Sequence, residues 1–223
     1  MNKQCKGISG HPMSRKPLDS TVIALANTVA AKDPYMLNHQ HRVAEIACAI
    51  ADKMGCGPQI IKGIRVSGFL HDLGKIAVPD IILFKPGRLN QQEFDLVKMH
   101  PSEGYRILKG IDFPWPVALA ALQHHERLDG SGYPYGLSGS EIILEARILA
   151  VADVMAAITS HRPYRPARSL TEAFKEVSGK SGILYDPEVV RACLEVCKPQ
   201  LRGLRYGRLR AKDLDPAQIP SSY

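Results

Sequence analysis

The chain has 223 residues, 29 Lys and Arg against 22 Asp and Glu, and 45% hydrophobic residues. These values suit one globular domain with a short appendage, and they exclude disordered, collagen-like and low-complexity proteins. No apolar run reaches the roughly 18 residues that a membrane span needs, and residues 1–15 have no apolar leader, so we expect a cytoplasmic protein with no membrane partner.

The net charge of +7 favours an anionic ligand such as a nucleotide, a nucleic acid or an acidic lipid. The basic residues are not interleaved with aromatic side chains that stack on bases, so we do not expect DNA as a partner. The five cysteines are odd in number and widely spread, which favours reduced thiols over a disulfide framework. Net charge alone does not identify which of the remaining anionic ligands is bound, so that assignment depends on the sequence motifs.

The chain divides into three parts of different composition. Residues 1–17 lack periodicity and are interpreted as a tail or linker, residues 18–200 as the domain, and residues 201–223 as a basic C-terminal extension. The apolar face of the first helix, residues 18–32, suits a connector to an upstream sensor module, a signalling protein or a second copy in a homodimer. Packing of that helix on its own domain is the alternative.

The domain contains a series of helix signals and no clear alternating strand. Asp33-Pro34 suits the start of a second helix, which ends at the glycine- and proline-rich residues 55–58. The segments 76–89 and 128–139 are expected to be long loops, which in a compact domain are usually functional. The pattern therefore predicts an all-α fold of about seven or more helices. Further helices are expected at 59–69, from the capping box of Asn90 and Glu93, at 117–123, at 142–158, after Ser169 and after Asp186.

Five histidines fall in segments that are otherwise apolar, and carboxylates accompany them. Asp72 follows the apolar helix 59–69, and Asp153 lies within 142–158, where an unpaired carboxylate would be costly to bury. Each histidine alone is more simply explained as a structural residue. Together, imidazoles and buried carboxylates suit divalent cations, and one carboxylate can bridge two of them. The histidines are His39, His71, His100, His124 and His125.

Two motifs resemble those of a known family. His71-Asp72 with Gly74-Lys75 is the HD signature, and HHERLDGSGYP at residues 124–134 resembles the HD-GYP extension. On these motifs the chain is identified as a member of the HD-GYP family of bacterial cyclic di-GMP phosphodiesterases, with the resemblance running from about residue 33 to residue 186. The resemblance implies an HD-type helical bundle around a dinuclear metal site.

The resemblance also implies which residues bind the two divalent metal ions. One ion would have four ligands and the other three, with Asp72 bridging them. Iron or manganese is favoured over closed, four-coordinate zinc by the histidine and carboxylate ligands. Some members hold a third ion through a glutamate at the position of Tyr35, and a phenol is a poor substitute, so two ions are predicted. The first set is His39, His71, Asp72 and Asp153; the second is His100, His124 and His125.

The implied reaction is hydrolysis of cyclic di-GMP to linear pGpG, or onward to GMP, by a hydroxide that bridges the metals. Asp72 and Lys75 are the expected catalytic residues, and Lys75 would clamp the phosphate or neutralise the leaving oxygen. Arg162 and Arg165 would bind phosphate or guanine through their planar guanidinium groups. Tyr133 would bind substrate or pack within its loop.

Other positions leave alternatives open. Ala156 replaces a second aspartate that is common in the family, which favours a weakly active module that senses nucleotides and binds proteins. Another alternative is hydrolysis of a different nucleotide, such as cyclic GMP-AMP, because a metal centre acts on phosphate and does not read bases. Asp129, more than Glu126, is expected to orient the histidines from outside the ligand set.

Overall fold

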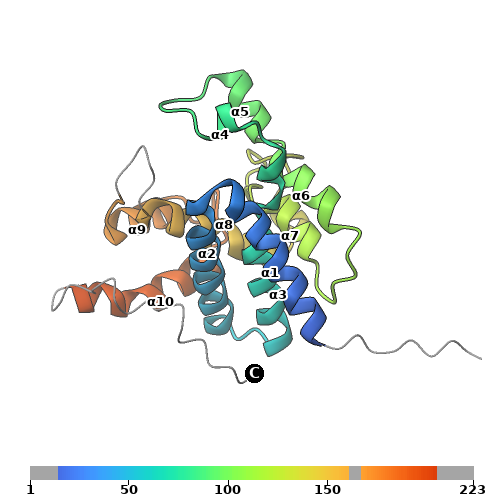
Figure 1. Ribbon diagram of the computed structural model, residues 1–223. Coiled ribbons are helices and arrows are strands. Elements are labelled where there is room, and N and C mark those ends of the chain that lie inside the picture. The colour runs from blue at the N-terminus through green and yellow to red at the C-terminus, as the bar shows by residue number, and fades with distance from the viewer. Residues whose placement is uncertain (1–14, 161–166, 205–223) are drawn as a thin grey trace, which may run out of the picture.

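The computed structural model describes residues 15–160 and 167–204, and these residues form helices and no strand. Figure 1 shows most of the helices gathered into one bundle. The predicted all-α bundle of seven or more helices is confirmed. The elements are α1 (Arg15–Lys32), α2 (Pro34–Lys53), α3 (Pro58–Leu70), the 3-10 helix η1 (Leu73–Ala77), α4 (Asp80–Leu83), α5 (Gln91–Val97), α6 (His100–Leu108), α7 (Val117–Gln123), the 3-10 helix η2 (Gly139–Glu141), α8 (Leu144–Thr159), α9 (Leu170–Gly179) and α10 (Pro187–Leu204).

Helix α8 is the centre of the larger core. Its residues are apolar on most sides, so it is stable only when neighbours surround it. It packs against α2, α7, α9 and α10, and Ile148, Leu149 and Met155 are among the most deeply buried side chains. The sequence places the start of this helix at residue 142, whereas it begins at Leu144 because η2 precedes it and Ile143 is extended.

A second core cluster lies between α1, α3, α6 and α7. Val22, Ala26 and Val29 of α1 are buried there, together with Leu70 and Leu108. The domain itself covers this apolar face of α1, while an upstream sensor, a signalling protein or a second copy as a partner stays a prediction. The alternative, packing within the domain, is what the structure shows.

Residues 79–99 form a segment that rises from the bundle, and we call it the protruding segment (Figure 1). It includes α4 and α5, and neither helix has a buried residue. The capping box of Asn90 and Glu93 is present as predicted, with Glu93 N donating to Asn90 Oδ1 and Asn90 N donating to Glu93 Oε2. The expected loop at 76–89 is interrupted by α4, because a single helical turn leaves no clear periodicity.

Two further points complete the fold. Helix α6 was not expected from sequence, since its first turn combines His100 and Pro101 with the polar residues Ser102 and Glu103 instead of an apolar stripe. Among the described residues, no helix has both the length and the apolar character needed to cross a membrane.

Candidate metal centre

The seven predicted metal ligands come from separate elements and meet in the interior. They fall into two groups, and within each group the ligand atoms lie within 4.8 Å of one another. The α2, α3 and α8 helices, which pack together, supply the first group, while the ends of α6 and α7 supply most of the second. The first group is His39, His71 and Asp153; the second is Asp72, His100, His124 and His125.

The two oxygens of Asp72 point to different groups of ligands. Asp72 Oδ1 lies 3.2 Å from His100 Nε2 and 3.9 Å from His124 Nε2. Asp72 Oδ2 lies 3.3 Å from His71 Nε2 and 3.9 Å from His39 Nε2. One carboxylate therefore stands between both groups, which is the arrangement of a bridging ligand.

Three histidines are oriented in the same way by the helices that carry them. The Nδ1 atoms of His71, His100 and His124 each lie 2.7 Å from the carbonyl oxygen three residues earlier, at Gly68, Val97 and Ala121. A carbonyl oxygen only accepts, so each Nδ1 must carry the proton and donate it. In its neutral form each ring then has a lone pair on Nε2, as a metal ligand requires.

Several of these Nε2 and oxygen atoms have no hydrogen-bond partner of their own. His71 Nε2 and Asp72 Oδ1 are buried without one, and His39 Nε2 approaches Asp153 Oδ1 at 3.0 Å without hydrogen-bond alignment. His100 Nε2 and His124 Nε2 face each other at 3.3 Å, although both carry lone pairs when Nδ1 holds the proton. Buried acceptors that converge without a donor are costly unless a cation lies between them. The residues therefore fit a divalent metal.

The charges of the site favour the ionisation states of metal ligands at Asp72, His124 and His125. Burial favours the neutral form of Asp72, but Lys75 and His71 outweigh it and hold the pKa of Asp72 well below its usual range. Burial and neighbouring imidazoles hold the pKa values of His124 and His125 well below normal, so both rings stay neutral. The pKa of His71 is raised by Asp72 although burial opposes it, which marks a place that attracts positive charge.

Lys75 lies beside the shared carboxylate. Its Nζ donates to Asp72 Oδ2 at 2.6 Å, and its side chain is 18% exposed. The local backbone requires Gly74 at the preceding position, because a Cβ there would overlap the carbonyl oxygen of His100 and the amide of Gly104. The glycine thus lets η1 approach α6 closely enough for Asp72 and His100 to share the site.

Tyr133 covers the outer side of the second ligand group. Its ring stacks on His125, with 4.7 Å between centroids and 28° between planes, and its backbone N donates to the His125 carbonyl. Burial raises the pKa of the phenol, so Tyr133 keeps its proton. Arg162 and Arg165, the other predicted substrate-binding residues, lie outside the described residues, as does the side chain of Tyr35.

The structure corrects the roles expected for two acidic loop residues. Asp129 is exposed and accepts from the backbone and hydroxyl of Ser131, so it braces its own turn and does not orient a histidine. Glu126 is buried and accepts from the backbone N of Tyr135 and of Leu137, which ties together the two ends of the loop around Tyr133.

Ala156 is fully buried in the larger hydrophobic core. It lies one helical turn from Asp153, on the same side of α8. In this chain the position therefore contributes apolar packing next to the site.

Two curated proteins that the chain resembles are cyclic dinucleotide phosphodiesterases. The chain is 42% identical over 176 residues to the cyclic di-GMP phosphodiesterase response regulator RpfG of Xanthomonas campestris, covering 78% of this chain and 47% of the relative. It is 40% identical over 153 residues to the 3′3′-cGAMP-specific phosphodiesterase 1 of Vibrio cholerae, covering 69% of this chain and 36% of the relative. The chain thus spans less than half the length of either curated relative.

The fold also has a solved counterpart. The structure of Bd1817, an HDGYP protein from Bdellovibrio bacteriovorus, matches with a TM-score of 0.61 over 83% of this chain and 65% of that one, at 19% identity. At that identity the match shows the fold. Residues 24–189 match the family described as HD domain, and this range contains all seven converging ligands. The chain belongs to the HD domain family, in agreement with the resemblance that its HD and GYP motifs predict.

Proposed function

We propose that this chain is a metal-dependent phosphodiesterase that hydrolyses cyclic di-GMP to linear pGpG. The observation that carries the proposal is Asp72, whose two oxygens face two separate sets of imidazoles. Similarity to RpfG, a cyclic di-GMP phosphodiesterase, supports the choice of substrate. We further propose two ions, iron or manganese, because the donors are nitrogen and oxygen atoms without thiolate.

In this proposal the seven converging side chains hold the ions, and Asp72 is shared. Bound divalent cations would supply Lewis-acid polarisation of the phosphoryl group and a lowered pKa for an attacking water. The carbonyls of Gly68, Val97 and Ala121 keep three imidazoles oriented with Nε2 toward the centre. This preorganisation means that the ligands need not rearrange during the reaction.

The remaining chemistry falls to residues at the edge of the centre. Hydrolysis to pGpG forms one new P–O bond from water and breaks one P–O3′ bond, and the departing O3′ takes up a proton. Among the described residues, Lys75 places a cation where negative charge would develop on the leaving oxygen, since its Nζ lies at Asp72 Oδ2 and its side chain reaches solvent. It would bind a phosphoryl oxygen or neutralise the leaving oxygen.

The experiment combines metal analysis with product chromatography on purified wild-type protein and Asp72→Ala. We expect about two ions per chain and pGpG from the wild type, and loss of both metal and turnover from the variant. Asp52→Ala is the matched control, because Asp52 is an exposed carboxylate in the last turn of α2. If Asp72→Ala keeps metal and turnover, the ligand assignment is wrong.

A second candidate substrate is cyclic GMP-AMP. The similarity to a 3′3′-cGAMP-specific phosphodiesterase is almost as high as that to RpfG, and a metal centre acts on the phosphate without reading the base. Turnover of the two cyclic dinucleotides, compared at equal concentration, separates the candidates. If kcat/KM is higher for cyclic GMP-AMP, then cyclic GMP-AMP and not cyclic di-GMP is the preferred substrate.

A further inference from the structure

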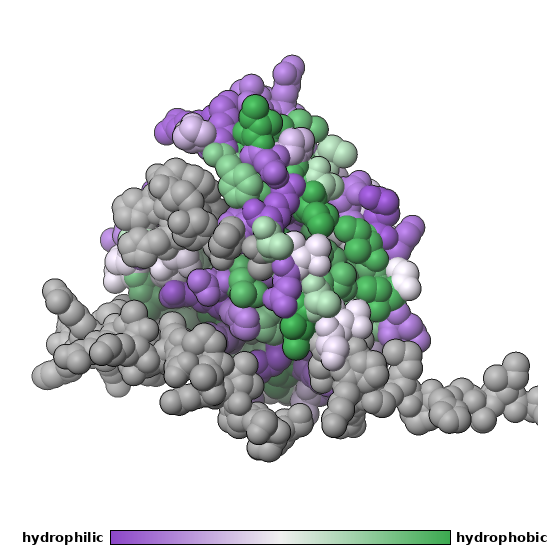
Figure 2. Space-filling view, viewed as in Figure 1, coloured by the Kyte–Doolittle hydropathy of each residue, from purple (hydrophilic) through white to green (hydrophobic). Residues whose placement is uncertain are grey.

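The protruding segment carries large hydrophobic side chains on its surface. Figure 2 shows hydrophobic residues among hydrophilic ones at the top of the molecule, where α4 and α5 lie. Phe84 is 45% exposed and Phe94 41% exposed, and Ile81, Leu96 and Met99 are exposed as well. Leaving an aromatic ring in water forfeits the stabilisation that burial would provide, so the exposed ring of Phe94 calls for a reason.

Phe94 differs from the other exposed residues because its ring is connected to the metal centre. The Phe94 ring meets the Tyr133 ring at 6.5 Å between centroids and 79° between planes. Tyr133 stacks in turn on His125, and its ring lies 6.5 Å from that of His100. The Tyr133 ring therefore connects the Phe94 ring to the histidines of the candidate active site.

The backbone fixes this relation. The Val97 carbonyl at the end of α5 accepts from His100 Nδ1, so the helix that carries Phe94 is held by a metal ligand. Phe94 thus lies next to the centre, on the side where Tyr133 stacks on His125.

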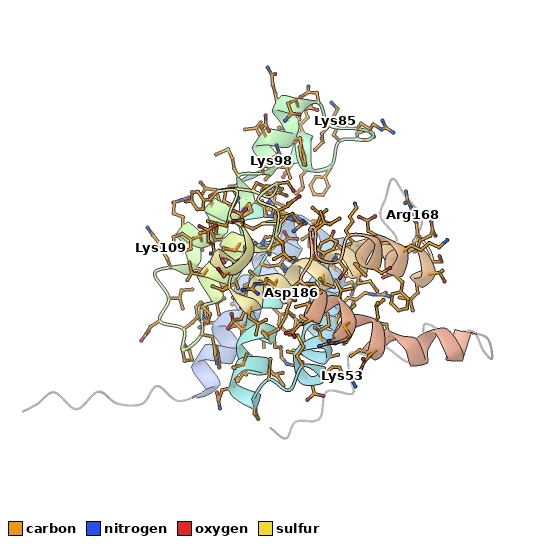
Figure 3. The ribbon with its side chains drawn as sticks, turned by 180° about the vertical axis from the view of Figure 1, so that it is seen from behind. Lys53, Lys85, Lys98, Lys109, Arg168 and Asp186 are labelled. Atoms are coloured by element: carbon orange, nitrogen blue, oxygen red, sulfur yellow. The ribbon has the colours of Figure 1, made fainter. Side chains whose placement is uncertain are left out.

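The electrostatics around Phe94 also suit a nucleotide. Lys98 Nζ lies 4.8 Å from the centroid of the Phe94 ring, a cation–π contact, and 2.9 Å from Asp95 Oδ1. Figure 3 shows Lys98 at the base of the protruding segment, near the bundle. An aromatic face with a lysine beside it is a common means of binding a base attached to a phosphate.

We propose that Phe94 is the stacking platform for one purine base of the cyclic dinucleotide. The proposal rests on the proposed function and adds a base-recognition residue that the metal ligands do not supply. With a phosphate at the metal centre, one purine extends past Tyr133 and stacks on the exposed part of the Phe94 ring. Stacking is tolerant of base identity, so this platform would accept guanine and adenine alike.

A purely structural role for Phe94 makes a different prediction. Phe94 is the fourth residue of α5, where it can pack on Leu89 before the capping box as a hydrophobic staple. A leucine would preserve such a staple but has no aromatic face. Phe94→Leu therefore removes stacking and keeps the local apolar contact, whereas Phe94→Tyr preserves both.

The test compares kcat/KM for cyclic di-GMP with kcat/KM for methyl 4-nitrophenyl phosphate, a phosphodiester without a purine. For Phe94→Leu we expect this ratio to fall about ten-fold, mainly through a higher KM for the dinucleotide. Phe94→Tyr should keep the ratio. Phe84→Leu is the matched control, because Phe84 is equally exposed on the same segment and has no ring contact with Tyr133 among the described residues.

A direct readout uses a cyclic dinucleotide in which 2-aminopurine replaces one guanine. Its fluorescence should be quenched on binding to metal-loaded wild-type protein, and much less on binding to Phe94→Leu. If the wild type is active and Phe94→Leu keeps both the kcat/KM ratio and the quenching, Phe94 is not the stacking platform. The proposed function would be unaffected by that result. A wild type that hydrolyses neither cyclic dinucleotide would instead overturn the proposed function.

Discussion

The candidate metal centre and the protruding segment are opposite in construction. His71, Asp72, His100 and His124 are almost completely buried, and the ring nitrogens that do not face the centre are bonded to backbone carbonyls. The protruding segment has no buried residue in either of its helices. In one region polar groups are buried in the interior, and in the other large apolar side chains are exposed among polar ones.

This difference indicates where substitutions should lower the free energy of unfolding most. Buried polar groups that converge on one point are tolerated only if the backbone around them is exact in position, so small changes there should have large effects. Surface side chains of the segment contact little of the bundle and are free to serve binding. The following predictions test this contrast, beginning with the largest effect.

The largest effect is expected from Gly74→Ala. A Cβ at this position would overlap backbone atoms of His100 and Gly104, which cannot move like a flexible side chain. We expect a loss of about 3 kcal/mol or more in the free energy of unfolding, together with a loss of bound metal. Denaturant titration and metal analysis measure both. Gly179→Ala, where a Cβ meets no atom within 4 Å, should be nearly neutral. Full stability in Gly74→Ala would show that the η1–α6 contact is not tight.

Lys75→Met should reduce catalysis without emptying the centre. The substitution removes the ammonium group beside Asp72 and keeps most of the side-chain volume. Because one cationic donor near the developing charge is lost, we expect kcat/KM to fall roughly a hundred-fold with metal content unchanged. Lys85→Met is the control, since Lys85 pairs with Glu93 on the protruding segment. Equal activity of the two variants would refute the role of Lys75.

Glu126→Gln should loosen the loop that holds Tyr133. Glu126 accepts two backbone N–H groups, from Tyr135 and Leu137, and a glutamine has only one carbonyl oxygen to offer. We expect the free energy of unfolding to fall by about 1 kcal/mol, because a partly buried N–H group loses its partner. Glu141→Gln, an exposed member of the capping box with Ser138, should change it by no more than about 0.5 kcal/mol. Similar losses in both variants would contradict the assignment of Glu126.

The smallest effect is expected in the protruding segment. Ile81 is 83% exposed, so Ile81→Ser should alter the free energy of unfolding by less than about 0.5 kcal/mol. Leu149→Ala in the centre of α8 should cost about 3 kcal/mol by comparison. Denaturant titration of both variants measures the contrast. A large loss from Ile81→Ser would mean that the segment is packed more firmly than its exposure indicates.

Much of the fold could be predicted because its signals are local. The start of α2 at Pro34 and the capping boxes of α5 and α9 follow from neighbouring residues, and all three are present. The short α4 and the mostly polar α6 could not be predicted, because neither has an apolar stripe long enough to show periodicity. The partner of α1 depends on packing between distant segments, which the helical face alone does not specify.

The candidate site shows the same division. The ligand residues were identified through motifs, and the structure brings all seven together, although their role as ligands stays a prediction. Asp129 and Glu126 could not be told apart from sequence, because their burial depends on how the loop closes on Gly132. The approach of Phe94 to Tyr133 joins residues 39 positions apart and leaves no local signal.

The most direct test of the central claim is electron paramagnetic resonance of the manganese-loaded protein. If Asp72 bridges two ions about 4 Å apart, the spectrum at two equivalents of Mn²⁺ should be that of an exchange-coupled pair. Asp72→Ala should lose that coupled signal. A wild-type spectrum showing only isolated Mn²⁺ ions at full loading would contradict the shared carboxylate, and with it the dinuclear centre.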